Sequence, residues 1–205
     1  MKRVVLVISL LTFLMVLLCE CTGPVAGSET TNGFTVAVKN GEVSGKTVPG
    51  GEVMCFSGSY DPDSLIGYAD TVRADAQGRF SFGKLASMDY NIFTVGTGGD
   101  SCALIQYINP DKQIDTTVDF RGVMSIHGMT VYSSQPVPGA HVAVLGTPYL
   151  TLSGAEGEFS FVSVPDGTFT VKSVAYDRGV KGELAGSKVV SRESNWNGAL
   201  IIEMN

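Results

Sequence analysis

Glycine and proline interrupt this 205-residue chain so often that it has little room for helices. The sequence contains 25 glycines and 8 prolines, and after Leu18 the longest stretch free of both is Lys84–Val95, which spans 12 residues. Helices in globular proteins average about 11 to 12 residues, and both glycine and proline destabilise a helix interior. The spacing therefore disfavours helical bundles and doubly wound α/β folds, and it predicts an all-β protein.

The charge distribution disfavours nucleic acid as a partner. The formal net charge is −6, and lysine and arginine are scattered through the chain without forming a cluster. A nucleic-acid-binding surface needs a basic patch that neutralises phosphates. We therefore expect no nucleic-acid partner.

The N-terminus has the pattern of an export signal. Lys2 and Arg3 precede an uncharged run, Val4–Leu18. As a helix this run would be about 22 Å long, which is shorter than the roughly 30 Å hydrocarbon core of a bilayer. A basic start followed by a short apolar run is typical of a secretory signal peptide. We predict that residues 1–20 are a signal peptide and that the rest of the chain is exported.

The end of the apolar run, Leu18-Cys19-Glu20-Cys21, resembles a bacterial lipoprotein signal, in which a cysteine after the run receives the lipid. Cys21 is the better acceptor, because Leu18 then stands three positions before it. Residues 21–32 are small and polar, which is typical of a flexible tether. We expect an outer-membrane or cell-surface lipoprotein, held to the membrane by its N-terminal lipid. The alternatives are cleavage after Gly27, which gives a soluble secreted or periplasmic protein, and an uncleaved anchor.

After Gly33 the chain is a series of short runs rich in β-branched and aromatic residues. Phe34–Val38 alternates, and the Asn40-Gly41 pair after it is a strong signal for a tight hairpin turn. Similar runs recur about every ten residues, which predicts antiparallel Greek-key β-sandwiches. The other predicted strands are Glu52–Phe56, Thr71–Ala74, Arg79–Phe82, Tyr90–Val95, Ala103–Ile108, Thr116–Phe120, Val123–His127, His141–Leu145, Leu150–Ser153, Glu158–Val162, Thr168–Ala175, Gly186–Val190 and Ala199–Glu203.

Two blocks of sequence occur twice. The block VPGGEVMCF, which starts at Val48, matches VPGAHVAVL from Val137 at four of nine positions. The block ADAQGRFSF, which starts at Ala74, matches SGAEGEFSF from Ser153 at five of nine positions. Such self-similarity predicts a tandem repeat of one structural unit.

The two copies differ in length between the blocks. The first block repeats after 89 residues and the second after 79, so the first copy holds ten extra residues within Ser57–Val72. A longer hairpin or loop accommodates them without a change of fold. We therefore expect two tandem β-sandwich domains, the first at residues 33–121 and the second at residues 122–205.

The second block also carries local structural signals. Gly78 suits the left-handed position of a hairpin turn, because glycine adopts positive φ without strain. Phe80 and Phe82 are two residues apart, so they share one face of a strand. The second copy repeats these three residues as Gly157, Phe159 and Phe161.

The motifs PVPGAHVAVLGT and GAEGEFSFVSVPDGTFTV of the second copy resemble the carboxypeptidase regulatory-like domain, which is transthyretin-like and is grouped with carbohydrate-binding-like folds. The resemblance covers Gly122–Ala175 well and Gly33–Arg121 more weakly. It implies a Greek-key sandwich and no catalytic residues, because the shared motifs are turn and core signatures.

The two cysteines beyond the signal region, Cys55 and Cys102, have two interpretations. Two buried cysteines in an exported protein can form a disulfide. They can equally be two separate small core residues, because free cysteine packs as a small hydrophobe.

The residues that carry chemistry form no recognisable catalytic or metal motif, so we expect no enzymatic activity, no metal and no cofactor. The two histidines, His127 and His141, lack the closely spaced glutamate of a zinc peptidase. Asp61-Pro62-Asp63 is a candidate for weak calcium binding, although it lacks the regular spacing of a calcium loop. The alternative is an ordinary acidic loop.

Two functions of different classes remain. The first is a non-catalytic lipoprotein of the cell envelope that presents its β-sandwiches for structural or protein-interaction roles. The second is a carbohydrate-binding accessory protein at the cell surface, in which Trp196 and Tyr149 stack on sugar rings. Envelope proteins and polysaccharides are the corresponding partners.

Overall fold

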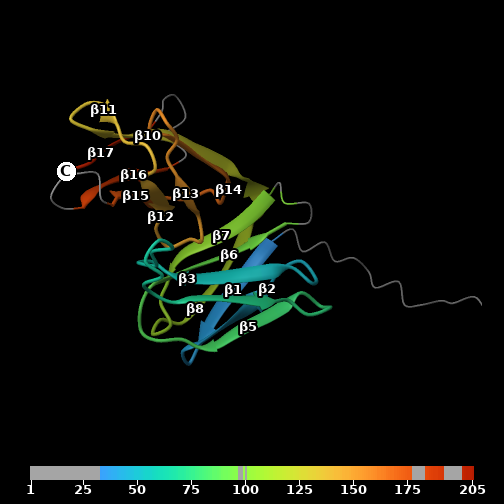
Figure 1. The fold of residues 1–205 in the computed structure, drawn as a ribbon. Coiled ribbons are helices and arrows are strands. Elements are labelled where there is room, and N and C mark those ends of the chain that lie inside the picture. The colour runs from blue at the N-terminus through green and yellow to red at the C-terminus, as the bar shows by residue number, and fades with distance from the viewer. Residues whose placement is uncertain (1–32, 97–98, 100, 177–182, 192–199) are drawn as a thin grey trace, which may run out of the picture. The chain divides into compact units, whose positions relative to one another are not determined.

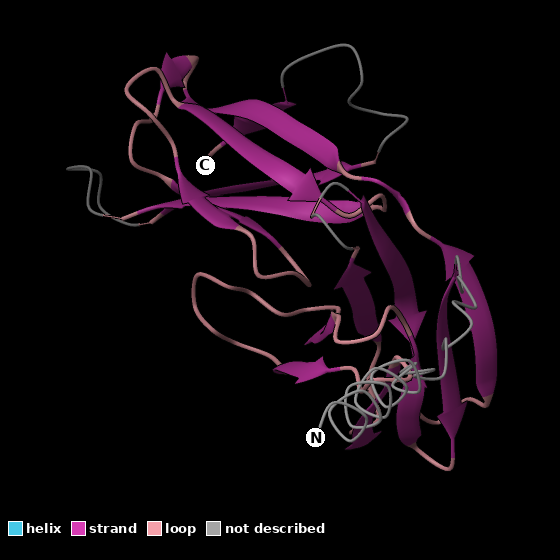
Figure 2. Cartoon of the chain, turned by 90° about the vertical axis from the view of Figure 1, so that its right-hand side faces the viewer, coloured by secondary structure: helices cyan, strands magenta, loops and turns pink. Residues whose placement is uncertain are grey.

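The computed structural model describes residues 33–96, 99, 101–176, 183–191 and 200–205. All regular structure in these residues is β-strand, as the magenta arrows of Figure 2 show. The expected signal peptide (residues 1–20) and the expected tether (residues 21–32) lie outside the described residues. Residues Thr31–Asn205 form one compact unit. The finer division into domains at residues 33–121 and 122–205 stays a prediction, and these ranges are called the first copy and the second copy below.

The first copy consists of two sheets. Sheet 1 has the strand order β5-β2-β1-β8, and sheet 2 has the order β4-β3-β6-β7-β9. Neighbours such as β2 and β5 are not consecutive in sequence because the chain crosses between the sheets, which is the Greek-key pattern. The strands are β1 (Gly33–Lys39), β2 (Glu42–Lys46), β3 (Glu52–Ser57), β4 (Ala69–Arg73), β5 (Arg79–Lys84), β6 (Tyr90–Val95), β7 (Ser101–Ile108), β8 (Ile114–Asp119) and β9 (Arg121–Gly122).

The second copy also consists of two sheets (Figure 1). Sheet 3 has the order β11-β10-β14, and β17 also pairs with β10. Sheet 4 has the order β13-β12-β15-β16. One pair is parallel, because β17 runs alongside β10 in the same direction. The strands are β10 (Met124–Tyr132), β11 (Gln135–Pro136), β12 (His141–Val144), β13 (Leu150–Leu152), β14 (Glu158–Val164), β15 (Phe169–Ala175), β16 (Leu184–Val190) and β17 (Leu200–Glu203).

Each copy has its own hydrophobic core between its two sheets. In the first copy, side chains such as Phe34 on sheet 1 and Ile92 on sheet 2 pack together and are fully buried. In the second copy, Phe161 on sheet 3 packs in one cluster with Val142 on sheet 4. Alternate burial along β1 and β10 shows that one face of each strand meets the core and the other does not. The all-β sandwich fold expected from the sequence is confirmed.

The sequence repeat corresponds to a repeat of backbone hydrogen bonds. In the first copy Thr47 N–H donates to Gly78 C=O at 2.8 Å, and in the second copy Thr130 N–H donates to Gly157 C=O at the same distance. Gly78 and Gly157 have φ values of +76° and +74°, as expected for the left-handed position of the turn. Two further hydrogen bonds also recur. The bond from Ala74 N–H to Gly51 C=O corresponds to the bond from Ser153 N–H to Ala140 C=O. The bond from Gly78 N–H to Asp75 C=O corresponds to the bond from Gly157 N–H to Gly154 C=O.

A close contact between a glycine and a phenylalanine also recurs. Phe80 lies over Gly45, where an added Cβ would be 2.6 Å from the ring, and Phe159 lies over Gly128, where the distance would be 2.4 Å. Glycine is needed here because the ring occupies the space of a side chain. The pair Gly45 and Phe80 in the first copy therefore corresponds to the pair Gly128 and Phe159 in the second copy.

The extra residues of the first copy lengthen one hairpin, as expected. Strands β3 and β4 pair over five positions, and residues 57–68 connect them. The equivalent strands β12 and β13 pair over three positions, and residues 144–149 connect them. The second copy has a smaller addition of its own, the β10–β11 hairpin. This hairpin separates Thr130 from Val137, whereas the corresponding residues of the first copy, Thr47 and Val48, are adjacent.

Three strands were not expected from the sequence. Strand β2 follows the Asn40-Gly41 turn, whose residues have φ values of +54° and +80°. Its sequence, EVSGK, has a single apolar residue, so it carries no alternating pattern. Strands β9 and β11 are two residues each and are too short to leave any periodic signal.

Candidate functional site

The most distinctive polar site lies where the long hairpin of the first copy meets sheet 4 of the second copy. Residues 57–68, called the insertion loop below, fold back on themselves through a bridge between Asp61 and Ile66. Asp63 N–H donates to Oδ1 of Asp61 at 3.0 Å, which fixes the two carboxylates relative to each other. The loop is anchored by Tyr60, which is buried and packs on Phe56 with ring centroids 5.0 Å apart.

Both carboxylates of the insertion loop bind side chains of the second copy. Asp61 Oδ2 accepts a hydrogen bond from Lys172 Nζ at 2.8 Å. Asp63 Oδ1 lies 2.5 Å from His141 Nδ1, and Asp63 Oδ2 accepts a hydrogen bond from the Tyr176 hydroxyl at 2.9 Å. We call these five residues the joint.

Sheet 4 presents the partners on one face. His141 is the first residue of β12, and Lys172 lies on the neighbouring strand β15 opposite Ala143. Residues two apart on a strand share a face, so His141, Ala143 and Lys172 point to the same side. Ala143 is almost fully buried, which indicates that the insertion loop covers this part of the sheet. The His141 and Tyr176 rings also meet edge to face, with centroids 5.2 Å apart.

Two groups of the joint have shifted pKa values that fit their hydrogen bonds. Burial raises the pKa of Asp61, but the hydrogen bonds from Lys172 and from the Asp63 backbone outweigh it, so the pKa lies below its ordinary value. The hydrogen bond to the Asp63 carboxylate, with burial as a smaller cause, raises the pKa of Tyr176 to about 12. Asp61 is therefore a carboxylate and Tyr176 a neutral hydroxyl at neutral pH, which is the state that their hydrogen bonds require.

A second contact joins the two copies beside the joint. Gly146 N–H donates to Tyr60 C=O at 2.7 Å, and Gly146 C=O accepts a hydrogen bond from Asn91 Nδ2 at 3.2 Å. Gly146 has a φ of +74°, and a Cβ added there would be 2.4 Å from Asn91 Nδ2. Only glycine fits this turn without displacing Asn91.

A third contact involves β7 and the turn between β14 and β15. Gln106 forms two hydrogen bonds to the backbone of Thr168, one at 2.9 Å through Nε2 and one at 3.1 Å through Oε1. Leu104, two residues earlier on the same face of β7, packs against the core of the second copy. Arg121 and Asp166 form an ion pair at 3.5 Å. The two copies therefore meet through polar and apolar contacts at three places.

The two cysteines are not joined by a disulfide. Cys55 lies on β3 and Cys102 on β7, and β6 separates these strands. Two strand spacings amount to about 10 Å, whereas a disulfide needs Cα atoms within about 7 Å. Both are buried, which agrees with the alternative interpretation of two separate core residues.

The other residues singled out in the sequence are dispersed. Cys21 and Trp196 lie outside the described residues, so lipidation and sugar stacking by these residues stay predictions. Tyr149 is half-buried at the edge of the second core, and its hydroxyl donates to Ser163 C=O at 2.6 Å. Burial, with the nearby Cys102 as a smaller cause, raises the pKa of Tyr149 to about 12. Its role in ligand stacking also stays a prediction.

The calcium interpretation of Asp61 and Asp63 is not supported. Their carboxylates bind Lys172, His141 and Tyr176. Within the described ranges no group of three or more His, Cys, Asp or Glu residues is arranged to hold a metal ion.

The sequence indicated the acidic loop residues Asp61 and Asp63, but it did not indicate which residues bind them. The repeat contains a usable signal, because Lys172 occupies the position of Phe93 in the first copy. Phe93 is buried in an apolar cluster. An apolar core position that becomes lysine in the other copy indicates a specific acidic partner, and the acidic loop peculiar to the first copy is the natural candidate.

Comparisons with known proteins do not assign the chain to a family. No family model and no curated protein matches the chain. Among solved structures, the minor pilin GBS52 of Streptococcus agalactiae is 11% identical, with a TM-score of 0.35 over 78% of this chain and 85% of that one. The major pilin BcpA of Bacillus cereus is 11% identical, with a TM-score of 0.30 over 84% of this chain and 59% of that one. The shaft pilin SpaA of Lactobacillus rhamnosus GG is 10% identical, with a TM-score of 0.26 over 78% and 86%.

Scores and identities this low carry no argument about function, so the β-sandwich fold rests on the strands and cores of the chain itself. None of the described segments is a helix long and apolar enough to cross a membrane.

Proposed function

We propose that this protein is a non-catalytic lipoprotein of the cell envelope, anchored through Cys21, in which two carboxypeptidase regulatory-like β-sandwiches act together as one structural or protein-interaction body. The observation that carries the proposal is the joint. It connects residues 111 apart in sequence and belongs to a loop that only the first copy has. Two copies that were connected only by the chain between them would not need such a contact.

The chemistry of the joint supports a structural role. Each carboxylate accepts hydrogen bonds from the opposite copy, and these bonds satisfy groups that would otherwise be costly to bury. Asp61 has a side chain only 12% exposed, and the ion pair with Lys172 is therefore less screened than a surface pair. The acidic, basic and hydroxyl groups of the joint are thus used to hold the copies together and are not directed at an open cavity.

The structural part of the proposal is tested by measuring whether the two copies tumble together. Nitrogen-15 relaxation of the full chain should give one rotational correlation time for amides of both copies. Replacing both loop carboxylates, Asp61→Ala with Asp63→Ala, should lower the correlation time of each copy, because the copies then move independently. Replacement of two exposed aspartates outside the joint, Asp115→Asn with Asp119→Asn, should leave it unchanged. Independent tumbling of the unmodified chain would remove the basis of the proposal.

The anchoring part is tested by mass spectrometry of the mature N-terminus. We expect a chain that begins at Cys21 and carries the mass of its acyl groups, and that partitions into detergent. Cys21→Ala should abolish both the added mass and the partitioning. An unmodified chain that begins at Ser28 would identify a soluble secreted protein and would contradict the lipoprotein hypothesis.

A further inference from the structure

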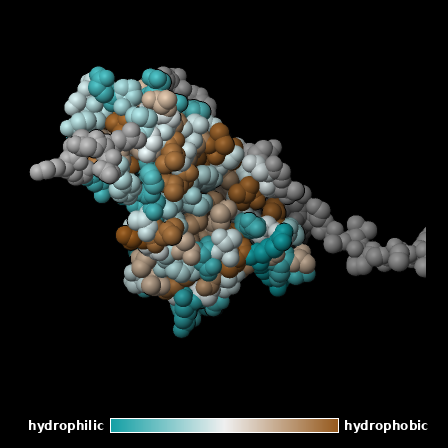
Figure 3. All heavy atoms as spheres, in the orientation of Figure 1, coloured by the Kyte–Doolittle hydropathy of each residue, from teal (hydrophilic) through white to brown (hydrophobic). Residues whose placement is uncertain are grey.

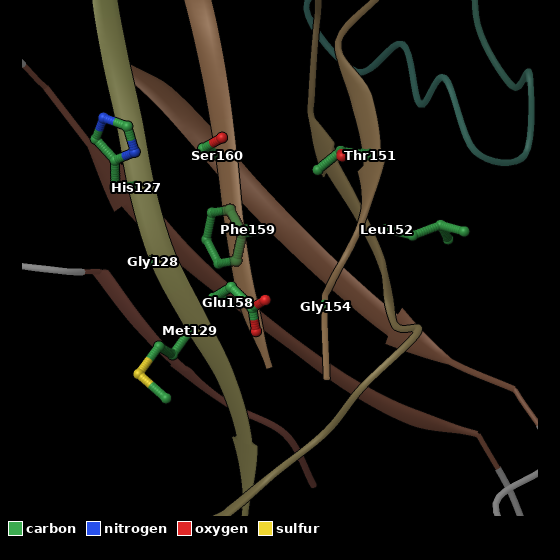
Figure 4. A pocket seen from close by; sticks show the side chains of 9 residues that line it. All are labelled: His127, Gly128, Met129, Thr151, Leu152, Gly154, Glu158, Phe159 and Ser160. Carbon is green, nitrogen blue, oxygen red and sulfur yellow. The ribbon is translucent and has the colours of Figure 1, made fainter. Parts of the chain in front are cut away.

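The second copy has an open groove of about 500 Å³ on one side of its sandwich. The groove lies between β13, the edge strand of sheet 4, and β14, the edge strand of sheet 3. In Figure 4 Thr151 projects from β13 toward β14, while the side chain of Leu152 points away from β14. Met129 and His127 of β10 border it on the far side of β14.

The backbone of β14 is open toward this side. In an antiparallel pair, residues whose main-chain groups point at the partner alternate with residues whose groups point away. Thr130 N–H donates to Gly157 C=O, so by this alternation Glu158 and Ser160 point away from β10. Glu158 C=O accepts a hydrogen bond from Gly154 N–H at 2.7 Å, which agrees with this direction. The main-chain groups of Ser160 are left at the open edge.

The short strand β13 is open in the same way. Val144 N–H donates to Tyr149 C=O, and Ser153 N–H donates to Ala140 C=O, so the main-chain groups of Leu150 and Leu152 point away from β12. Unpaired main-chain groups on an edge strand are a template for a further strand.

The corresponding edge strand of the first copy, β4, differs in length and packing. Strand β4 has five residues where β13 has three. Val72, which corresponds to Thr151, packs against the first core, and so does Tyr68, the last residue of the insertion loop. Tyr68 meets Tyr90 edge to face at 5.5 Å. The second copy therefore has a shorter edge strand, and a polar Thr151 stands where the first copy has Val72 packed against its core.

The charges and exposed apolar side chains along β14 indicate what kind of segment can bind there. Glu158 is exposed and stands where the first copy has Arg79. Together with Glu156 it makes the rim acidic, and neither glutamate forms an ion pair with a described lysine or arginine. Val162, two residues beyond Ser160, is 65% exposed. Exposed hydrophobic residues, drawn in brown, are also visible on the face of the molecule that Figure 3 shows. A second copy of this acidic chain would bring glutamate against glutamate, so charge disfavours it.

We propose that this groove binds an extended segment of a partner protein, which adds to β14 as a further strand and carries basic residues alternating with apolar ones. The main-chain groups of Ser160 pair with the segment. Its basic side chains lie on the outer face, where one faces Glu158 and the methylene stem of another covers Val162. Its apolar side chains alternate with these and point into the groove beside Phe159. In an added strand, main-chain hydrogen bonds supply affinity and alternate side chains supply specificity. The proposal goes beyond the structural role above and depends on neither the lipid anchor nor the joint.

The test uses the full chain in detergent and a fluorescein-labelled peptide of sequence VKVKTKV with blocked ends. We expect saturable binding, together with slower hydrogen exchange at the Ser160 amide. Glu158→Arg, which introduces the residue of the first copy, should weaken binding at least about fivefold, because it replaces an attraction by a repulsion. Glu42→Arg on β2 makes the same change of net charge in the first copy and should alter the affinity less than twofold.

Two control peptides separate strand addition from attraction by charge. Replacement of the lysines by glutamates should abolish binding. Replacement of alternate residues by proline, with the lysines kept, should also abolish it, because proline donates no main-chain hydrogen bond. Equal binding of the proline peptide, no binding of the lysine peptide, or an equal loss in Glu42→Arg would each overturn the proposal. The exchange measurement on the unmodified chain decides the matter even if Glu158→Arg does not fold.

Discussion

Lys172 Nζ lies 2.8 Å from Asp61 Oδ2, so a strand of the second copy is bound to a loop of the first copy across 111 residues of sequence. Asp61 belongs to the hairpin extension that distinguishes the first copy, and Lys172 replaces a phenylalanine of the repeat. Both partners are therefore departures from the repeated pattern. The two copies have diverged at the surface where they meet, while their turns and cores have stayed alike.

The Asp61–Lys172 pair should contribute measurable stability. In a double-mutant cycle with Asp61→Asn and Lys172→Met, we expect a coupling energy of about 1 to 2 kcal/mol, as is usual for hydrogen bonds between charged groups that are partly buried. Urea unfolding of the four proteins measures it. Lys188→Met on β16 is the matched control, because Lys188 is exposed, and its coupling to Asp61→Asn should be near zero. A coupling near zero for Lys172 as well would mean that solvent screens the pair completely.

The same pair predicts a pH dependence. The pKa of Asp61 is lowered in the folded protein, because its hydrogen bonds outweigh the effect of burial. A carboxyl group with a lowered folded pKa stabilises the protein above its unfolded pKa of about 3.9, and this stabilisation is lost as the pH falls through the folded pKa. The unfolding free energies of the unmodified chain and of Asp61→Asn should therefore differ at pH 7 and converge below about pH 4. Urea unfolding of both proteins at a series of pH values measures this difference.

The glycine and phenylalanine contacts give a prediction for each copy. A Cβ on Gly45 would lie 2.0 Å from Thr35 C=O, and a Cβ on Gly128 would lie 2.4 Å from Leu200 C=O. Backbone atoms of a neighbouring strand cannot move aside easily, so Gly45→Ala and Gly128→Ala should each cost about 2 kcal/mol or more. Gly122→Ala is the control, because no atom lies within 4 Å of the added Cβ. Thermal unfolding measures all three, and tolerance of alanine at either strand would contradict the shared packing.

The elements with local signals were predictable. The Asn40-Gly41 turn, the glycines at 78 and 157 and the paired phenylalanines all lie as the sequence indicated, because a positive φ or a two-residue period is encoded in adjacent residues. Strand β2 was missed, although the turn before it requires a returning strand. Its outward face carries Ser44, and its inward face carries Gly45, whose place Phe80 fills from the next strand. Val43 is the single apolar side chain that β2 buries in the core, and one apolar residue leaves no periodicity.

The joint was only half predictable, because it depends on tertiary contacts. In the sequence Asp61 and Asp63 form an acidic pair, for which calcium is a candidate ligand. Their actual partners are His141 on β12, Lys172 in the middle of β15 and Tyr176 just after it. No local pattern links these segments to the loop. A position-by-position comparison of the two copies would have drawn attention to Lys172. It would not have identified Tyr176, which lies just beyond β15.

The buried cysteines give a final prediction, for thiol reactivity. Burial, with the charge of Asp70 as a smaller cause, raises the pKa of Cys55 to about 12. The reactive form of cysteine is the thiolate, so Cys55 should resist iodoacetamide at pH 8 in the folded chain and react within minutes in concentrated urea. Because no disulfide joins Cys55 to Cys102, dithiothreitol should leave the midpoint of thermal unfolding unchanged. Peptide mass mapping without reductant provides the check, and a linked Cys55–Cys102 peptide would show that β3 and β7 are closer than the sheet order places them.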